Sequence, residues 1–197
     1  EWILARACED FVKVLQASRK PLSLSINVSA KQLEHKQFIS IAQSIIQKKG
    51  VPPQRILFEI TETALVQHPE HTSQVINQLR AMGIKFMLDD FGVGYSSMQY
   101  LKSLPISFIK IDKSFIQSVT ENDNDSAIVL ATIKLSQALG LQTIAEGVET
   151  LEQLYFLQAH GCNQVQGFFL AKPLTIEELL ARIRADELSP SNTLLTS

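Results

Sequence analysis

The amino-acid sequence predicts an α/β protein of the (β/α)-barrel type, on three observations. Short β-branched runs alternate with longer stretches of helical periodicity, which is the pattern of βα units on a parallel sheet. About six such units follow one another along the chain. Each expected strand also carries a polar residue near its end; in a barrel these residues meet at one rim, whereas an open sheet gathers them at one switch point. We therefore expect a TIM-barrel-like fold that is N-terminally incomplete, because a closed barrel needs about eight strands.

The first quarter of the chain predicts a helix, a strand and a second helix. Apolar residues recur with helical period over residues 2–18. The β-branched run Leu22–Val28 predicts the first strand. A helix is expected over residues 31–49, because two lysines and then Gly50 give the usual signal for a helix C-terminus.

The rest of the chain repeats this order of strand and helix. The expected strands are Ile56–Ile60, Lys85–Asp89, Phe108–Ile111, Gln142–Ala145 and Gln164–Leu170. The expected helices cover about residues 69–82, 96–103, 125–139 and 150–160, and a last one begins near Thr175. We expect one domain over residues 1–187 and a disordered tail or linker over residues 188–197.

Composition excludes several classes of protein. The hydrophobic fraction of 45% and the charged fraction of 19% are ordinary for a soluble domain, and the net charge of −2 argues against DNA or RNA as a partner. Cys8 and Cys162 are far apart and belong to no metal-binding motif, which favours the reducing cytoplasm. The chain starts at Glu1 inside a helical pattern, so we expect a longer parent protein, which further domains could anchor to a membrane.

The polar residues at the strand ends are of the kinds that bind hard metal ions. Oxygen ligands from Asn, Asp and Glu suit Mg²⁺ or Mn²⁺. Taken one at a time, Asn27, Glu59 or Gln166 could equally cap a turn or form a hydrogen bond. Lys110 could equally form a simple salt bridge to a neighbouring carboxylate. The set consists of Asn27, Glu59, Asp89, Asp90, Lys110, Glu146 and Gln166.

The adjacent pair Asp89-Asp90 could help to hold two ions about 3.5–4 Å apart, the arrangement that stabilises both the attacking and the leaving oxygen in phosphoryl displacement. Lys110 would then orient or help to deprotonate the attacking water and compensate negative charge in the transition state. The residues by themselves thus predict a two-metal hydrolase.

The segments around these residues resemble the EAL domain family, in family order and from the N-terminus to about residue 185. The matching segments are Asn27–Leu33, Phe58–Glu62, Asp89–Ser97, Ile109–Asp112, Ala145–Thr150 and Gln166–Phe169, with Lys172-Pro173 after the last. The resemblance implies a TIM-barrel-like phosphodiesterase, with two Mg²⁺ or Mn²⁺ ions per site, that hydrolyses the bacterial second messenger cyclic di-GMP to linear pGpG.

The resemblance also implies a role for each position. The implied metal ligands are Asn27, Glu59, Asp89, Asp90 and Glu146, with Asp89 bridging the two ions. The implied catalytic residues are Lys110, which contacts the attacking water, Glu146, and Gln166, which belongs to the network of water and metal.

A regulatory loop is implied over Phe91–Ser97, with Gly92 and Gly94 supplying its backbone freedom. Glu62 matches a glutamate that anchors this loop, and Glu149 a supporting acid near the metal ligands. The loop links the metal site to a dimer contact in the family, so a homodimer is expected.

One family motif is absent from the chain. The family takes its name from a Glu-Ala-Leu segment within a Glu-x-Leu-x-Arg pattern, which supplies a further metal ligand and a phosphate contact, and no such pattern occurs here in that context. Whether this stretch is active by itself is left open, and the alternative function is a non-catalytic cyclic di-GMP receptor or interaction module. The resemblance implies a parent protein that also contains sensory or GGDEF-type domains.

Overall fold

Six parallel strands form one curved sheet in the part of the chain that the structure describes. The computed structural model describes residues 1–62, 64, 69–92, 101 and 104–188. The strands pair in the order of the chain and are β1 (Leu24–Asn27), β2 (Ile56–Thr61), β3 (Lys85–Phe91), β4 (Phe108–Ile111), β5 (Gln142–Glu146) and β6 (Gln164–Gln166). An open doubly wound sheet would reverse its strand order. The unbroken order is that of a half-barrel and confirms the predicted fold class.

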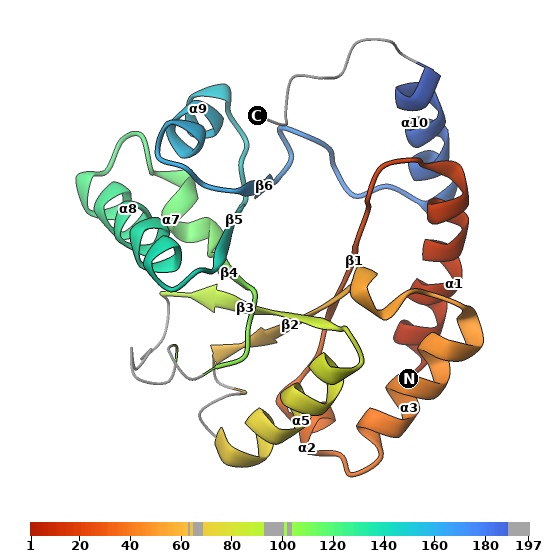
Figure 1. Ribbon diagram of the computed structural model, residues 1–197. Helices are drawn as coiled ribbons and strands as arrows, with labels where there is room; N and C mark the ends of the chain where they lie inside the picture. Colours follow the sequence, from red (N-terminus) through yellow and green to blue (C-terminus); the bar gives the residue numbers. More distant parts are fainter. Residues whose placement is uncertain (63, 65–68, 93–100, 102–103, 189–197) are drawn as a thin grey trace.

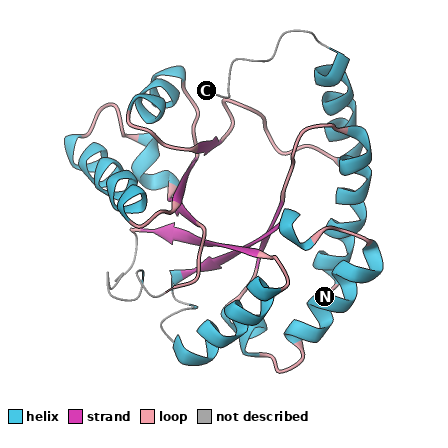
Figure 2. Ribbon diagram, in the orientation of Figure 1, coloured by secondary structure: helices cyan, strands magenta, loops and turns pink. Residues whose placement is uncertain are grey.

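The helices lie along the outer side of this curve (Figures 1 and 2). Right-handed crossovers between parallel strands place successive helices on the same side of the sheet when the strand order does not reverse. They are α1 (Trp2–Ala17), α2 (Ala30–Glu34), α3 (Phe38–Lys49), α5 (Pro69–Ala81), α7 (Lys113–Gln117), α8 (Asp123–Ala138), α9 (Leu151–Ala159) and α10 (Ile176–Leu188), with a 3₁₀ turn at Pro53–Arg55. Among the described residues, no helix is both long and apolar enough to cross a membrane.

The two faces of the sheet bury different apolar residues. On the outer face, Phe58, Phe86 and Ile109 are fully buried in the large core beneath the helices. Successive side chains of a strand point to opposite faces, so the residues next to these in sequence point to the concave side. There a separate inner layer takes one residue from each of four neighbouring strands, namely Leu57, Met87, Phe108 and Ile144.

The single helix expected over residues 31–49 is wrong, because the structure has two helices there. Ser29 and Gln32 form a reciprocal capping box that starts α2, and the extended backbone of His35 ends it. Leu33 and Phe38 are both buried although they are five residues apart. In one continuous helix, residues five apart lie on different sides, so the break is what brings both side chains to the core.

The strand expected over Gln164–Leu170 is too long by four residues, because β6 ends at Gln166. Gly167 packs directly against the backbone of Val148, where a Cβ atom would lie 2.1 Å from the carbonyl oxygen. The chain then turns, with the N–H of Leu170 donating to the carbonyl of Gly167. A glycine in close backbone contact marks the end of the strand, and the apolar residues 168–170 that follow it do not continue the sheet.

One further expectation changed, one helix was not expected, and two expectations cannot be compared with the structure. The first strand begins at Leu24, because the N–H of Leu22 donates to the carbonyl of Lys20 in a turn. The short helix α7 was not expected from the sequence. The helix expected near residues 96–103 and the tail over 188–197 lie almost entirely outside the described residues, so the domain boundary stays a prediction.

Candidate metal centre

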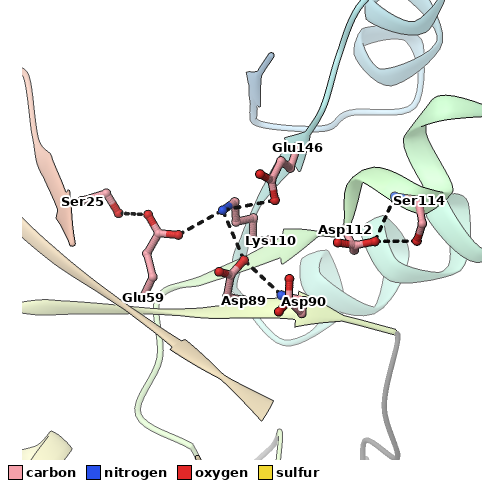
Figure 3. A network of polar contacts seen from close by, with 8 residues as sticks. All are labelled: Ser25, Glu59, Asp89, Asp90, Lys110, Asp112, Ser114 and Glu146. Carbon is pink, nitrogen blue, oxygen red and sulfur yellow. Dashed lines mark hydrogen bonds and ion pairs between the residues drawn. The ribbon is translucent and has the colours of Figure 1, made fainter. Parts of the chain in front are cut away.

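Four neighbouring strands each place a charged residue on the concave side of the sheet. Each strand already contributes one apolar residue to the inner layer, and the charged residue follows it two positions later in the same strand. Side chains two positions apart in a strand point to the same face of the sheet. All four therefore lie one step nearer the carboxyl ends of the strands, which is where barrel enzymes carry their active sites. Figure 3 shows them converging: Glu59 from β2, Asp89 from β3, Lys110 from β4 and Glu146 from β5.

Lys110 is at the centre of this group. Its Nζ lies 3.1 Å from Oε2 of Glu59, 3.2 Å from Oδ1 of Asp89 and 3.3 Å from Oε2 of Glu146 (Figure 3). The residue is only 6% exposed, and Glu59 and Asp89 are buried with it. An ammonium group has three N–H donors, so one lysine can serve three carboxylates. Lys110 thus neutralises part of a cluster of like charges.

The pKa of Lys110 lies above its ordinary value. Burial by itself lowers this pKa, because it disfavours the charged form, but the charge and hydrogen bond of Glu59 and the charges of Asp89 and Glu146 outweigh burial. Lys110 is therefore positively charged in the metal-free protein across the physiological pH range.

The backbone of β3 brings two adjacent aspartates to the same side. In a regular strand, Asp89 and Asp90 would point to opposite faces. The pairing of β3 with β4 shifts register between Leu88 and Phe91, and Asp90 has a φ of 55°, the only positive φ outside glycine among the described residues. Such a bulge re-aims a side chain, and left-handed backbone is most tolerable for Asp and Asn.

The result is a carboxylate cluster of a size that suits a metal ion. One oxygen each from Asp89, Asp90 and Glu146 lie within 4.8 Å of one another. Burial and then the charge of Asp89 raise the pKa of Asp90, which marks a site where negative charge is in excess. Because all three donors are hard oxygen ligands, the residues present fit a hard divalent cation.

Sequence reasoning missed two residues around this cluster. The Ser25 hydroxyl on β1 donates a hydrogen bond to Oε1 of Glu59 (Figure 3). Asp112 caps α7 by accepting from the N–H of Ser114 at 2.9 Å, and its charge adds to the rise in the pKa of Asp90. Polar residues such as Ser25 in a short strand, and helix caps such as Asp112 after a strand, are too common for the sequence pattern alone to indicate a role at a metal site.

Two predicted site residues lie at the two ends of the row of strands. Asn27 ends β1 and is in register with Glu59 of β2, while Gln166 ends β6 and is in register with Glu146 of β5. Both are exposed. Their register places them at the same carboxyl edge as the cluster, and their predicted roles stay predictions.

The residues predicted to regulate or support the site have mixed outcomes. Both carboxylate oxygens of Glu62 are buried without a hydrogen-bond partner within the described ranges, which is costly for a charged group. Phe91 is buried, and Gly92 has a φ of 100°, whereas Gly94 lies outside the described residues. Glu149 has an exposed side chain, and its N–H donates to Oε1 of Gln153 at 2.7 Å. None of these observations tests the predicted roles.

The model of the EAL domain matches residues 1–173 of this sequence. The chain belongs to the EAL domain family. Among its relatives is the bifunctional diguanylate cyclase/cyclic di-GMP phosphodiesterase MucR of Pseudomonas aeruginosa, which is 37% identical over 183 residues. That match covers 93% of this chain and 27% of MucR, so this EAL domain spans about a quarter of the relative's length.

Solved structures of EAL proteins share the fold. The MucR phosphodiesterase in complex with c-di-GMP has a TM-score of 0.86 and 36% identity, covering 90% of this chain and 72% of that one. BlrP1 of Klebsiella pneumoniae, solved with manganese and cy-diGMP, has a TM-score of 0.76 and 30% identity, covering 84% of this chain and 42% of that one. Similar EAL proteins thus bind the cyclic dinucleotide, and one does so together with a divalent metal.

Proposed function

We propose that this EAL domain hydrolyses cyclic di-GMP to linear pGpG with the help of Mg²⁺ or Mn²⁺. The observation that carries the proposal is the convergence of Asp89, Asp90 and Glu146 within 4.8 Å, directly beside Lys110. The cyclic di-GMP phosphodiesterases among the relatives support the choice of substrate, and the manganese bound by BlrP1 supports the choice of metal.

Each group at the carboxyl edge has a part in this reaction. The residues that would hold the two ions are Asn27, Glu59, Asp89, Asp90 and Glu146. Bound divalent ions lower the pKa of water and offset the charge of a phosphodiester. Water oxygen adds to one phosphorus, the bond from that phosphorus to the ribose 3′-oxygen breaks, and the 3′-oxygen takes up a proton.

Lys110 contributes positive charge at the place where the phosphodiester becomes more negative. Its Nζ is already held among the carboxylates at 3.1 to 3.3 Å, so its position needs no rearrangement of the strand. Where a metal ion takes over one of these carboxylates, the N–H that now faces that carboxylate would be free to orient the attacking water through a hydrogen bond and to stabilise the transition state. Gln166, at the end of β6, would add a second polar contact to the same water.

Replacing Glu146 tests the proposed function. Glu146→Ala removes one of the three clustered carboxylates, and hydrolysis of cyclic di-GMP in Mn²⁺ buffer should fall by at least about 100-fold, as expected when a direct contact in a catalytic site is lost. The matched control is Glu121→Ala, which removes an exposed carboxylate in the turn before α8 and should leave turnover unchanged. Product is measured by chromatography of pGpG.

Two results would contradict the proposal. Unchanged turnover in Glu146→Ala would show that the cluster does not carry the chemistry. Calorimetric binding of cyclic di-GMP without product, in the unaltered full-length protein, would instead support the alternative of a non-catalytic receptor. The homodimer, the additional signalling domains and the cytoplasmic location stay predictions.

A further inference from the structure

The carboxylate of Glu59 has a separate partner for each of its oxygens. Oε2 accepts from Lys110 Nζ at 3.1 Å, on the side of the carboxylate cluster. Oε1 accepts from the Ser25 hydroxyl, on the side of β1 (Figure 3). Glu59 is 7% exposed, so its carboxylate is largely shielded from water, whereas Ser25 itself is exposed.

Strand pairing explains why Ser25 can reach Glu59. Ser25 is in register with Leu57, and Asn27 with Glu59, so Ser25 stands one pleat below Asn27 on the same concave face. Diagonal neighbours on adjacent strands are within reach of a long side chain such as glutamate. Ser25 therefore contacts the Glu59 carboxylate from the side away from Lys110.

We propose that Ser25 is a positioning residue of the metal centre, which holds the carboxylate of Glu59 in one orientation for metal binding. The last torsion of a glutamate side chain is broad and roughly two-fold, so a carboxylate held at one oxygen alone can still rotate. A second, charge-assisted hydrogen bond removes that freedom. The inference rests on the proposed function only in so far as Glu59 serves as a metal ligand.

A role in metal binding is distinguishable from a role in folding. Hydrogen-bond partners of metal-ligating side chains typically change metal affinity by about 10–100-fold when they are removed. A hydrogen bond that only supports β1 would change stability and leave metal affinity as it was. Metal affinity measured without substrate is therefore the deciding quantity.

The test uses Mn²⁺ as the probe and calorimetry on the full-length protein without cyclic di-GMP. Ser25→Val and Ser25→Thr form a pair that differs only in a methyl group against a hydroxyl, and both are β-branched residues that favour strands. The Kd for Mn²⁺ should rise about tenfold in Ser25→Val and stay near that of the unaltered protein in Ser25→Thr. Ser23→Ala is the control, because this exposed serine just before β1 has no side-chain hydrogen bond to any residue that the structure describes.

A double substitution shows whether Ser25 acts through Glu59. In a Glu59→Gln background, Ser25→Val should cause no further loss of Mn²⁺ affinity, because the group that Ser25 positions is already altered. An equal loss in both backgrounds would overturn the proposal, as would an unchanged Kd in Ser25→Val or a failure of Ser25→Thr to restore it. Should Ser25→Val not fold, Ser25→Ala in the same assay takes its place with the same expectations.

The outcome is separable from that of the proposed function. If the unaltered protein binds Mn²⁺ and turns over no cyclic di-GMP, the proposed hydrolysis fails, while the effect of Ser25 on Mn²⁺ affinity still decides the positioning role. If the unaltered protein is active and Ser25→Val needs no more Mn²⁺ for half-maximal activity, the positioning role fails and the proposed function stands.

Discussion

Lys110 stands among three carboxylates whose mutual repulsion it offsets. The sequence predicts that Lys110 lies near the end of a strand, and that acidic residues lie near the ends of other strands. The distances that make it a common partner of all three depend on the strand order and curvature, which no single segment of sequence encodes. Ser25 shows the same limit, because only the register of β1 on β2 reveals its contact with Glu59.

Removing the lysine should destabilise the metal-free protein. Lys110→Met keeps the approximate volume but leaves buried Glu59 and Asp89 without their counter-charge, a change that typically costs about 3–5 kcal/mol. Urea unfolding in EDTA measures the loss. Mn²⁺ should then stabilise Lys110→Met more than it stabilises the unaltered protein, because the ion supplies the missing positive charge; equal stabilisation of both would contradict this account.

Asp90 should make the metal-free protein less stable at neutral pH than in mild acid. The pKa of Asp90 is raised, first by burial and then by the charge of Asp89, so the folded state binds a proton more readily than the unfolded state does. The resulting penalty is fully present above the raised pKa and disappears as the pH falls towards the ordinary value of about 3.9.

The variant Asp90→Asn removes this penalty and keeps a residue that tolerates left-handed backbone. In EDTA it should be more stable than the unaltered protein at pH 7, and this gain should shrink as the pH falls towards 5. Thermal unfolding across that range provides the measurement. A gain that is constant with pH would show that the charge of Asp90 is not its cause.

At the scale of elements, the parts that depend on local signals were predictable and the irregular parts were not. Most of the expected helices are present, and the strands begin and end within a few residues of their expected bounds. The bulge at Asp90 and the early end of β6 at Gly167 arise from contacts with neighbouring strands. Hydrophobic periodicity cannot predict such contacts between strands, because it describes one segment of the chain at a time.

Gly167 should tolerate no side chain, because an added Cβ would lie 2.1 Å from the Val148 carbonyl oxygen and 2.3 Å from its nitrogen. Gly167→Ala therefore has to push β6 away from the turn after β5, and it should lower stability by more than about 2 kcal/mol. The control is Gly140→Ala, where the φ of 70° strains alanine but nothing lies within 4 Å, with an expected cost of about 1 kcal/mol. Urea unfolding measures the free energy of unfolding of both variants. An equal loss in Gly167→Ala and Gly140→Ala would show that close packing against Val148 is not the cause.

At the scale of the whole molecule, the described sheet ends in β1 on one side and β6 on the other. Strand edges without partners offer free N–H and C=O groups to other chains. Large apolar side chains beside these ends are also exposed, including Ile3 near β1 and Phe168 and Phe169 after β6. The order of the six strands could be predicted from the sequence, whereas these open flanks could be seen only after the fold was assembled.

The 197-residue stretch, expressed alone, should therefore associate with itself. We expect it to elute ahead of a 22.0 kDa monomer in size-exclusion chromatography and to bind a fluorescent apolar dye. A monomeric, dye-negative stretch would mean that its edges are protected within the 197 residues.

The four charged groups of the centre come from β2, β3, β4 and β5, with no strand passed over. Any continuous piece that contains them all must therefore run from Glu59 to Glu146. A protease cut between Glu59 and Glu146, followed by separation of the pieces, therefore divides the ligand set and silences the centre.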